Sequence, residues 1–162
     1  MNAWSEFTDD EYAAIWDRFY ADFDFKPDYH ERSKPAISEP RPFVTFDLSA
    51  NLSDEITSEI DGLLLASFRA ITPAGQLVYW LDWHHTCYRF DPRRADGTGQ
   101  ISWYPDGDYY IFLASDFSWG TFGHPWQQSL CVFGASLLNR VDQPLRDRLM
   151  VLRESPPSEF VG

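Results

Sequence analysis

Apolar side chains recur every three to four positions between residues 9 and 23, and this period is typical of an amphipathic helix. Thr8 and Glu11 form the Thr-x-x-Glu pattern of a capping box, which marks the N-terminus of a helix. Asp9 and Asp10 add negative charge to the first turn, where the helix dipole favours it. The sequence therefore predicts a helix over residues 9–23. Its apolar stripe consists of Tyr12, Ile15, Trp16, Phe19, Tyr20 and Phe23.

A second long amphipathic helix is predicted after Ser53, which is a favourable N-cap residue. Asp54 and Glu55 follow in its first turn, and the helix is expected to end before Pro73. Its inner face consists of Ile56, Ile60, Leu63, Leu64, Ser67 and Ile71. A short third helix is predicted to begin at Gly134. Its apolar residues are Leu137, Leu138 and Val141.

Six further segments are rich in β-branched and aromatic residues and are predicted to be strands. They comprise residues 43–48, 76–83, 86–90, 108–114, 119–122 and 127–133. Residues 76–83 and 108–114 are apolar at both alternating sets of positions, which is typical of strands that are covered on both faces. A turn at His84–His85 would join residues 76–83 to a hairpin partner at residues 86–90. Residues 145–153 fit either a helix or an edge strand.

The order of these elements predicts an α+β fold. We expect an antiparallel sheet of about five to six strands, with the two long helices packed on one face and a short C-terminal helix. A chain of 162 residues fits one domain, which we place at residues 1–154, with a loose tail at residues 155–162. Four prolines between residues 26 and 42 favour an extended segment held by contacts, and residues 91–100 have the composition of a loop.

A formal net charge of −12 narrows the range of partners. Nucleic acid is not expected as a partner, because phosphate contacts require clustered Lys and Arg side chains, and anionic membrane surfaces are disfavoured for the same reason. The charge suits a basic partner, which opposite charge would steer toward the protein. Solubility alone is the simpler explanation of such a charge.

The sequence contains no run of about 18 apolar residues and no basic, apolar leader at its N-terminus. It therefore predicts a cytoplasmic protein without a transmembrane helix. Cys87 and Cys131 lie in apolar runs and do not form a CxxC pair, which indicates buried thiols. No P-loop, G-x-G-x-x-G or G-x-S-x-G motif is present, so no cofactor is predicted.

Residues 103–126 combine aromatic rings with polar groups. Nine of these 24 residues are aromatic, three are Asp, one is His, and none is Lys or Arg. Trp and Tyr side chains often anchor interfaces, and carboxylates beside them suit a cationic or neutral ligand. We therefore expect a surface for a partner or ligand in this segment, unless the aromatic residues simply form the core. Its members would be Trp103, Trp119, Trp126, Tyr109 and Asp106.

His124 is the best single candidate for a catalytic base, because only histidine titrates near neutral pH without help. Asp108 and Asp116 are the candidate catalytic carboxylates, since they flank one short predicted strand in an aromatic setting. A shared substrate would require His124 to lie within about 4–8 Å of one of these carboxylates. The alternative is that the Asp side chains only stabilise turns.

His84 and His85 form an adjacent pair close to Asp82. In one strand the two rings would point to opposite faces and could not share an ion, whereas in a turn they could. The sequence has no HxH, HExxH or CxxC spacing here, so no metal site is predicted.

In residues 103–126 and in several other segments, the chain resembles a bacterial family of unknown function, DUF2716. The matching segments are Trp103–Leu113, Asp116–Phe117, Gly120–Trp126 and Cys131–Gly134, together with Trp16–Phe19, Phe23–Phe25 and Pro27. This resemblance would span nearly the whole chain, and it implies no known chemistry. In the general style of its sequence, the chain is also similar to immunity proteins, which are small acidic proteins that neutralise toxins.

Two functional hypotheses remain open. The first is an interaction module, of the immunity type, that binds a basic partner through an aromatic-rich surface. The second is a small-molecule enzyme or ligand-binding protein with an aromatic-walled pocket, in which His124 acts with Asp108 or Asp116. The lack of any catalytic motif favours the first hypothesis.

Overall fold

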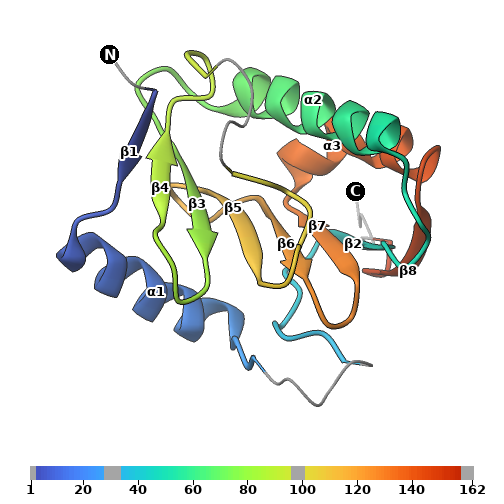
Figure 1. Ribbon diagram of the computed structural model, residues 1–162, viewed down its shortest axis with the longest axis horizontal. Coiled ribbons are helices and arrows are strands. Elements are labelled where there is room, and N and C mark those ends of the chain that lie inside the picture. Colours follow the sequence, from blue (N-terminus) through green and yellow to red (C-terminus); the bar gives the residue numbers. More distant parts are fainter. Residues whose placement is uncertain (1–2, 28–33, 96–100, 158–162) are drawn as a thin grey trace.

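The computed structural model describes residues 3–27, 34–95 and 101–157. Within these residues the chain forms one antiparallel sheet and three helices (Figure 1). In chain order the elements are β1 (Trp4–Glu6), α1 (Asp9–Phe23), β2 (Phe43–Asp47), α2 (Asp54–Ile71), β3 (Val78–Asp82), β4 (Tyr88–Phe90), β5 (Tyr110–Ala114), β6 (Gly120–His124), β7 (Ser129–Phe133), α3 (Ala135–Arg146) and β8 (Met150–Glu154). The strand order across the sheet is β1-β4-β3-β5-β6-β7-β2-β8. The predicted α+β class and the antiparallel pairing are confirmed.

The two long helices begin where their capping signals place them. In α1 the Glu11 amide donates to the Thr8 hydroxyl (3.2 Å), and the Thr8 amide donates to the Glu11 carboxylate (3.3 Å). In α2 the Ile56 amide donates to the hydroxyl of Ser53 (3.2 Å). These bonds satisfy amide groups that a helix leaves without internal partners, so local sequence is enough to fix both starting points.

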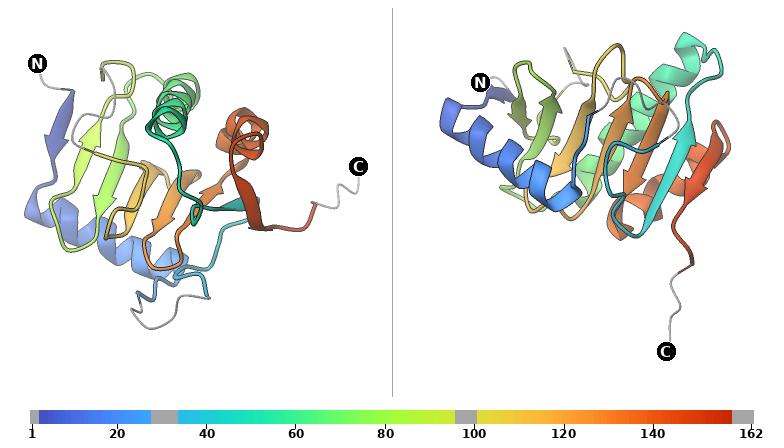
Figure 2. Two further views of the ribbon diagram at one scale, coloured as in Figure 1. Left: turned by 45° about the vertical axis from the view of Figure 1, so that its right-hand side comes forward. Right: turned by 90° about the horizontal axis from the view of Figure 1, so that it is seen from below.

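The sheet has apolar side chains on both faces, and each face is covered by a helical layer (Figure 2). In β5 the side chains of Ile111 and Leu113 pack toward α1, whereas Phe112 and Ala114 pack toward α2 and α3. Our expectation that the two long helices share one face is therefore wrong. The physical reason is already present in the central strands, because a strand that is apolar on both sides must be buried on both sides.

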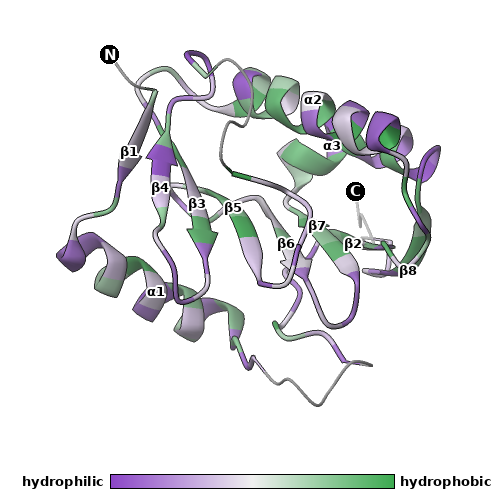
Figure 3. Cartoon of the chain, viewed as in Figure 1, coloured by the Kyte–Doolittle hydropathy of each residue, from purple (hydrophilic) through white to green (hydrophobic). Residues whose placement is uncertain are grey.

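The face covered by α1 is mainly aromatic. Phe19 lies above Phe122 of β6, with ring centroids 6.3 Å apart, and Phe23 packs against Phe133 of β7 at 5.4 Å. Figure 3 shows the matching pattern in α1 and α2, whose hydrophilic positions turn outward and whose hydrophobic positions turn toward the sheet. Large rings thus give one 15-residue helix a wide apolar surface against this face of the sheet.

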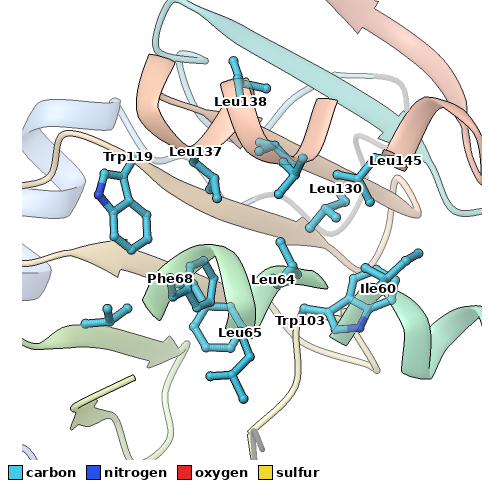
Figure 4. Packing of buried hydrophobic residues seen from close by; sticks show 14 of the residues in the cluster. Ile60, Leu64, Leu65, Phe68, Trp103, Trp119, Leu130, Leu137, Leu138 and Leu145 are labelled. Atoms are coloured by element: carbon cyan, nitrogen blue, oxygen red, sulfur yellow. The ribbon is translucent and has the colours of Figure 1, made fainter. Parts of the chain in front are cut away.

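The opposite face is covered by α2 and α3, which lie side by side. Phe68 of α2 packs between Phe112 and Trp119, at centroid distances of 5.0 and 5.2 Å. Leu137 and Leu145 of α3 complete this layer (Figure 4). The cluster joins residues from α2, α3 and five strands, so it holds together elements that are far apart in the sequence.

The sheet has eight strands in the described part of the chain, rather than the expected five to six, because β1 was not predicted and β8 was left open between a helix and an edge strand. β1 is three residues long, and β8 falls in the segment that fitted either a helix or a strand. The structure divides that segment, since α3 extends to Arg146 and β8 begins at Met150. A register shift in the pairing of β8 with β2 leaves Leu152 as an extra residue, and such bulges are common in edge strands.

A partly buried ionic network ties β8 to the proline-rich segment. The guanidinium of Arg153 donates two hydrogen bonds to the carboxylate of Glu39, at 2.5 and 2.9 Å, and the Thr45 hydroxyl donates to the same carboxylate. Ala36 and Ile37 are buried in the core beneath α1. The expected extended segment is thus held by contacts over residues 34–42, while residues 28–33 lie outside the described part of the chain.

The remaining expectations concern the loop and the tail. Residues 91–95 form turns, whereas residues 96–100 of the predicted loop lie outside the described residues. The amide of Ser155 donates to the carbonyl of Phe43 (3.0 Å), so the predicted loose tail does not begin at this residue, and residues 158–162 are not described. Among the residues that the structure describes, no helix is both long enough and apolar enough to cross a membrane.

Two glycines give a matched test of the close packing at the junction between β7 and α3, which lies against Ser118 and Trp119. Gly134 precedes α3 with a φ of +93°, and a Cβ there would lie 2.5 Å from the Ser118 carbonyl oxygen. We expect Gly134→Ala to lower the free energy of unfolding by about 2–4 kcal/mol, because strain and a steric clash add together. Urea denaturation followed by circular dichroism measures this change.

The control is Gly62→Ala, in the exposed middle of α2, where a Cβ would meet nothing within 4 Å. This substitution should leave stability unchanged or raise it by up to ~1 kcal/mol, because alanine is the better helix former. Equal effects of the two substitutions would contradict the packing described for Gly134.

Candidate functional site

Three segments bring polar side chains together at one end of the sheet. β3 ends at Asp82, and the pairing of Asp82 with Tyr110 sets the start of β5 beside it. Asp108 lies two residues before β5, and His85 lies in the turn between β3 and β4. Antiparallel pairing therefore places all three side chains at the same end of these central strands, although 26 residues of sequence separate Asp82 from Asp108.

These three side chains form what we call the Asp82–His85–Asp108 cluster. Nδ1 of His85 lies 3.0 Å from a carboxylate oxygen of Asp82 and 2.9 Å from a carboxylate oxygen of Asp108. One oxygen of each carboxylate and one imidazole nitrogen all lie within 4.8 Å of one another. The side chains of Asp82 and Asp108 are only 15% and 17% exposed, whereas that of His85 is 63% exposed. The cluster is thus an open imidazole above two largely buried carboxylates.

The cluster perturbs its own titration. Burial raises the pKa of Asp82 to about 6, the hydrogen bond and charge of His85 oppose this shift, and the nearby Asp108 carboxyl adds to it. The hydrogen bond with Asp82 and the charges of both carboxylates raise the pKa of His85. Two carboxylates this close disfavour the ionisation of both, and they favour a protonated imidazole beside them.

The backbone of the β3–β4 turn determines where His85 points. His84 has a φ of +65°, in the left-handed region, and its ring packs at a tilt against that of Trp83, with centroids 4.0 Å apart. The amide of His85 donates to the carbonyl of Asp82 (3.1 Å). The turn therefore separates the two histidines, so that only His85 faces the carboxylates.

An acidic hollow of about 570 Å³ lies next to the cluster and shares His85 with it. Its lining consists of Glu6, Phe7, Asp9, Tyr12, His84, His85, Thr86 and Cys87. The capped start of α1 supplies Asp9 and Tyr12, and the Phe7 amide donates to the Cys87 carbonyl (3.0 Å), which joins the two sides of the hollow. None of the eight lining residues is Lys or Arg, and the imidazoles of His84 and His85 are the basic groups that this lining contains.

The field of the cluster reaches the hollow. The pKa of Tyr12 is raised mainly by burial, and the negative charges of Asp82 and Asp108 contribute to the same shift. The pKa of Tyr110, at the start of β5, is raised by burial and by the same two carboxylates. A cationic group is therefore favoured at this end of the sheet, and an anion is disfavoured.

The aromatic residues predicted to form a binding surface do not form one. Trp103 and Trp119 are buried against α2, and Tyr109 is buried on the other face of the sheet, beneath α1. Trp126 is half-buried and packs against the core beneath α1. The expectation of exposed rings is wrong for the three buried residues. They serve the core, because a sheet with two apolar faces needs large side chains on both.

The three predicted Asp residues have separate environments. Asp106 is exposed, and its carbonyl accepts a hydrogen bond from the Tyr110 hydroxyl (3.4 Å). Asp116 is exposed in the β5–β6 turn, where the amide and hydroxyl of Ser118 both donate to its carboxylate, at 3.1 and 2.6 Å. This turn lies at the opposite end of the β5–β6 hairpin from Asp108. Only Asp108 belongs to a cluster with a possible chemical role.

His124 is buried, with 2% of its surface exposed, and it is held by backbone groups. The amide of Gln127 donates to its Nδ1 (3.1 Å), and a second backbone hydrogen bond involves Lys34. Burial lowers the pKa of His124 to about 4, and the charge of Arg153 acts in the same direction. The ring is therefore neutral near pH 7 and stabilises the β6–β7 turn, which favours a structural role over that of a base.

Sequence reasoning named Asp108 as a candidate and considered His84–His85 beside Asp82, but it did not connect Asp108 with Asp82 and His85 and predicted no metal site there. A usable signal was the turn at His84–His85, because in a turn the two rings need not point to opposite faces. The pairing of Asp82 with Tyr110, which brings Asp108 close, had no signal in the sequence, since register across 28 residues depends on the whole sheet.

The buried state of His124 predicts a specific dependence of stability on pH. Between about pH 6.5 and pH 4 the unfolded chain binds a proton that the folded His124 does not accept, so the free energy of unfolding falls as pH is lowered. The contribution amounts to at most ~3 kcal/mol. His124→Asn, whose side-chain oxygen can accept from the Gln127 amide, should have a shallower dependence over this range. Urea denaturation of both proteins from pH 7.5 to pH 4 tests this; parallel curves would mean that His124 is not the group responsible.

Comparison with known proteins identifies the family of the chain. A model of a protein family of unknown function, DUF2716, matches residues 6–138. An uncharacterized protein from Bacillus subtilis (strain 168), YxiI, is 35% identical over 119 residues, which cover 65% of this chain and 74% of that protein. No solved structure matches the chain. The family match includes α1, the Asp82–His85–Asp108 cluster and the central strands, and the chain therefore belongs to the DUF2716 family.

Proposed function

We propose that this protein is a binding module for a basic partner, which places a Lys or Arg side chain in the acidic hollow. The lining of the hollow carries this proposal. It offers two exposed carboxylates, from Glu6 and Asp9, and two aromatic rings, from Phe7 and Tyr12. Carboxylates form charge-assisted hydrogen bonds with a cationic head group, and aromatic faces attract it through cation–π contact.

The charge and size of the hollow support the same class of partner. The carboxylates of Asp82 and Asp108 lie beside the hollow, and their charges add to the effect of burial in raising the pKa of Tyr12. A volume of about 570 Å³ exceeds what one side chain fills and leaves room for neighbouring groups of a peptide segment. The net charge of −12 would speed the encounter with a basic protein.

This proposal keeps the class of partner that the sequence favoured and changes the surface. The partner would contact the start of α1 and the β3–β4 turn, instead of Trp103, Trp119 and Tyr109, which are buried. The alternative of an enzyme that uses His124 has less support, because that ring is buried and bonded to backbone groups.

A charge reversal at Asp9 tests the proposal. Asp9→Lys places a cation in the hollow and should weaken binding of a capped Lys-Gly repeat peptide about tenfold, because reversing one nearby charge changes the interaction by roughly 1–2 kcal/mol. Fluorescence anisotropy of the labelled peptide measures affinity, and the affinity of the original protein should fall as NaCl is raised. A capped Glu-Gly repeat should not bind.

The matched control is Asp17→Lys, which makes the same change in net charge at an exposed position of α1 outside the hollow. It should weaken peptide binding less than threefold, since salt screens charges beyond about 10 Å. Thermal unfolding verifies that both variants are folded. If both reversals weaken binding equally, the peptide senses only net charge, and the proposed location is wrong. If a free monovalent cation such as tetramethylammonium binds as tightly as the peptide, the partner is a small molecule.

A further inference from the structure

The Asp82–His85–Asp108 cluster has a chemistry of its own, which does not depend on a basic partner. We propose that it is a binding site for a divalent first-row transition-metal ion of the Zn²⁺ and Co²⁺ class. The sequence did not predict a metal site, because none of the familiar ligand spacings is present. The structure brings the ligands together from three separate places. Asp82 ends β3, His85 lies in the β3–β4 turn, and Asp108 lies two residues before β5.

The chemical types of the ligands select the class of ion. One imidazole and two carboxylates are a mixed nitrogen and oxygen set, which suits Zn²⁺, Co²⁺ and Mn²⁺. Mg²⁺ and Ca²⁺ prefer ligand sets made only of oxygen. The imidazole of His85 therefore favours transition metals over the two abundant hard cations.

The distances in the cluster fit one ion after small adjustments. Four ligands at about 2.1 Å from a tetrahedral ion lie ~3.4 Å from one another. Nδ1 of His85 lies 2.9 and 3.0 Å from the two carboxylate oxygens, and all three donor atoms lie within 4.8 Å. The side chains alone can make the adjustment, because rotation about Cα–Cβ bonds moves carboxylate oxygens by more than this difference.

The charges of the cluster also suit a divalent ion. Two carboxylates point at one imidazole nitrogen, and both are mostly buried. His85 is the one basic group among the three side chains of the cluster, and it carries a positive charge only when both of its ring nitrogens are protonated. A divalent ion between Nδ1 and the two carboxylates would balance both negative charges, which removes the repulsion between them.

The site is firmly supported on one side and open on the other. Asp82 belongs to β3, and the Asp108 carboxylate accepts a hydrogen bond from the Tyr109 amide (2.8 Å). The backbone at the ends of two central strands therefore holds both ligands in place. His85 is exposed and lines the acidic hollow, which gives an ion a path of entry. Three protein ligands also leave a position free for water or another small ligand.

The test is a titration of the purified 162-residue chain with Co²⁺ after treatment with a chelator. We expect visible absorption bands of bound Co²⁺ that saturate at one ion per chain, and we expect Zn²⁺ to displace the ion while Mg²⁺ in excess does not. Asp108→Asn and His85→Gln should each weaken binding by more than the 10–100-fold that loss of an outer-sphere partner typically costs. No peptide is present, so the result is independent of the proposed basic partner.

The matched controls are Asp106→Asn and His84→Gln, which change the same residue types one or two positions away, outside the cluster. Both should bind Co²⁺ like the original chain. Far-UV circular dichroism checks folding, and Zn²⁺ should raise the melting temperature of the controls but not of the cluster variants. The inference is overturned if no saturable one-to-one binding occurs, if the controls lose binding as the cluster variants do, or if Mg²⁺ competes as well as Zn²⁺.

Discussion

The central strands of this protein are buried on both faces, and the rest of the structure follows from that constraint. Every residue of β6 and β7 is buried, including His124, Thr121 and Ser129. A sheet of this kind is stable only when each face has its own apolar cover, so α1 must lie on one side and α2 with α3 on the other. The high content of aromatic residues serves this arrangement, because few large rings cover a wide surface.

The same constraint restricts polar chemistry to the ends of the strands. Between the two helical layers a charged side chain would lose its hydration without gaining a partner, whereas at a strand end it can reach solvent. One end of the sheet combines the Asp82–His85–Asp108 cluster with the acidic hollow beside α1. Both features favour positive charge, and His85 belongs to both. We propose that the function of this family member is concentrated at this end of the sheet and is directed to cations, either from a partner or as metal ions.

Much of the fold was predictable from local sequence. The helices at residues 9–23 and after Ser53 begin where hydroxyl side chains cap them, and the six predicted strands all exist with shifts of a few residues at their ends. The two remaining strands are the edges: β1 was not predicted, and β8 lies in a segment that fitted either a helix or an edge strand. Edge strands are short and partly exposed, so they lack the clear alternation or continuous apolar run that identifies a central strand.

The candidate site was predictable only in part. Asp108 was recognised as a carboxylate near aromatic residues, but Trp103 and Trp119 were expected on a surface and lie in the core. Sequence composition does not separate these cases, because the same rings that anchor interfaces also fill interiors.

The sequence by itself determined the class of the fold, the starts of the helices, the double-sided burial of the central strands and the strongly acidic charge, since each depends on residues close together in the chain or on composition alone. Only the tertiary structure decided which face each helix covers and which charged side chains meet. The approach of Asp108 to Asp82 and His85 results from the register between β3 and β5, and register is set by the packing of the whole sheet rather than by any nearby residue.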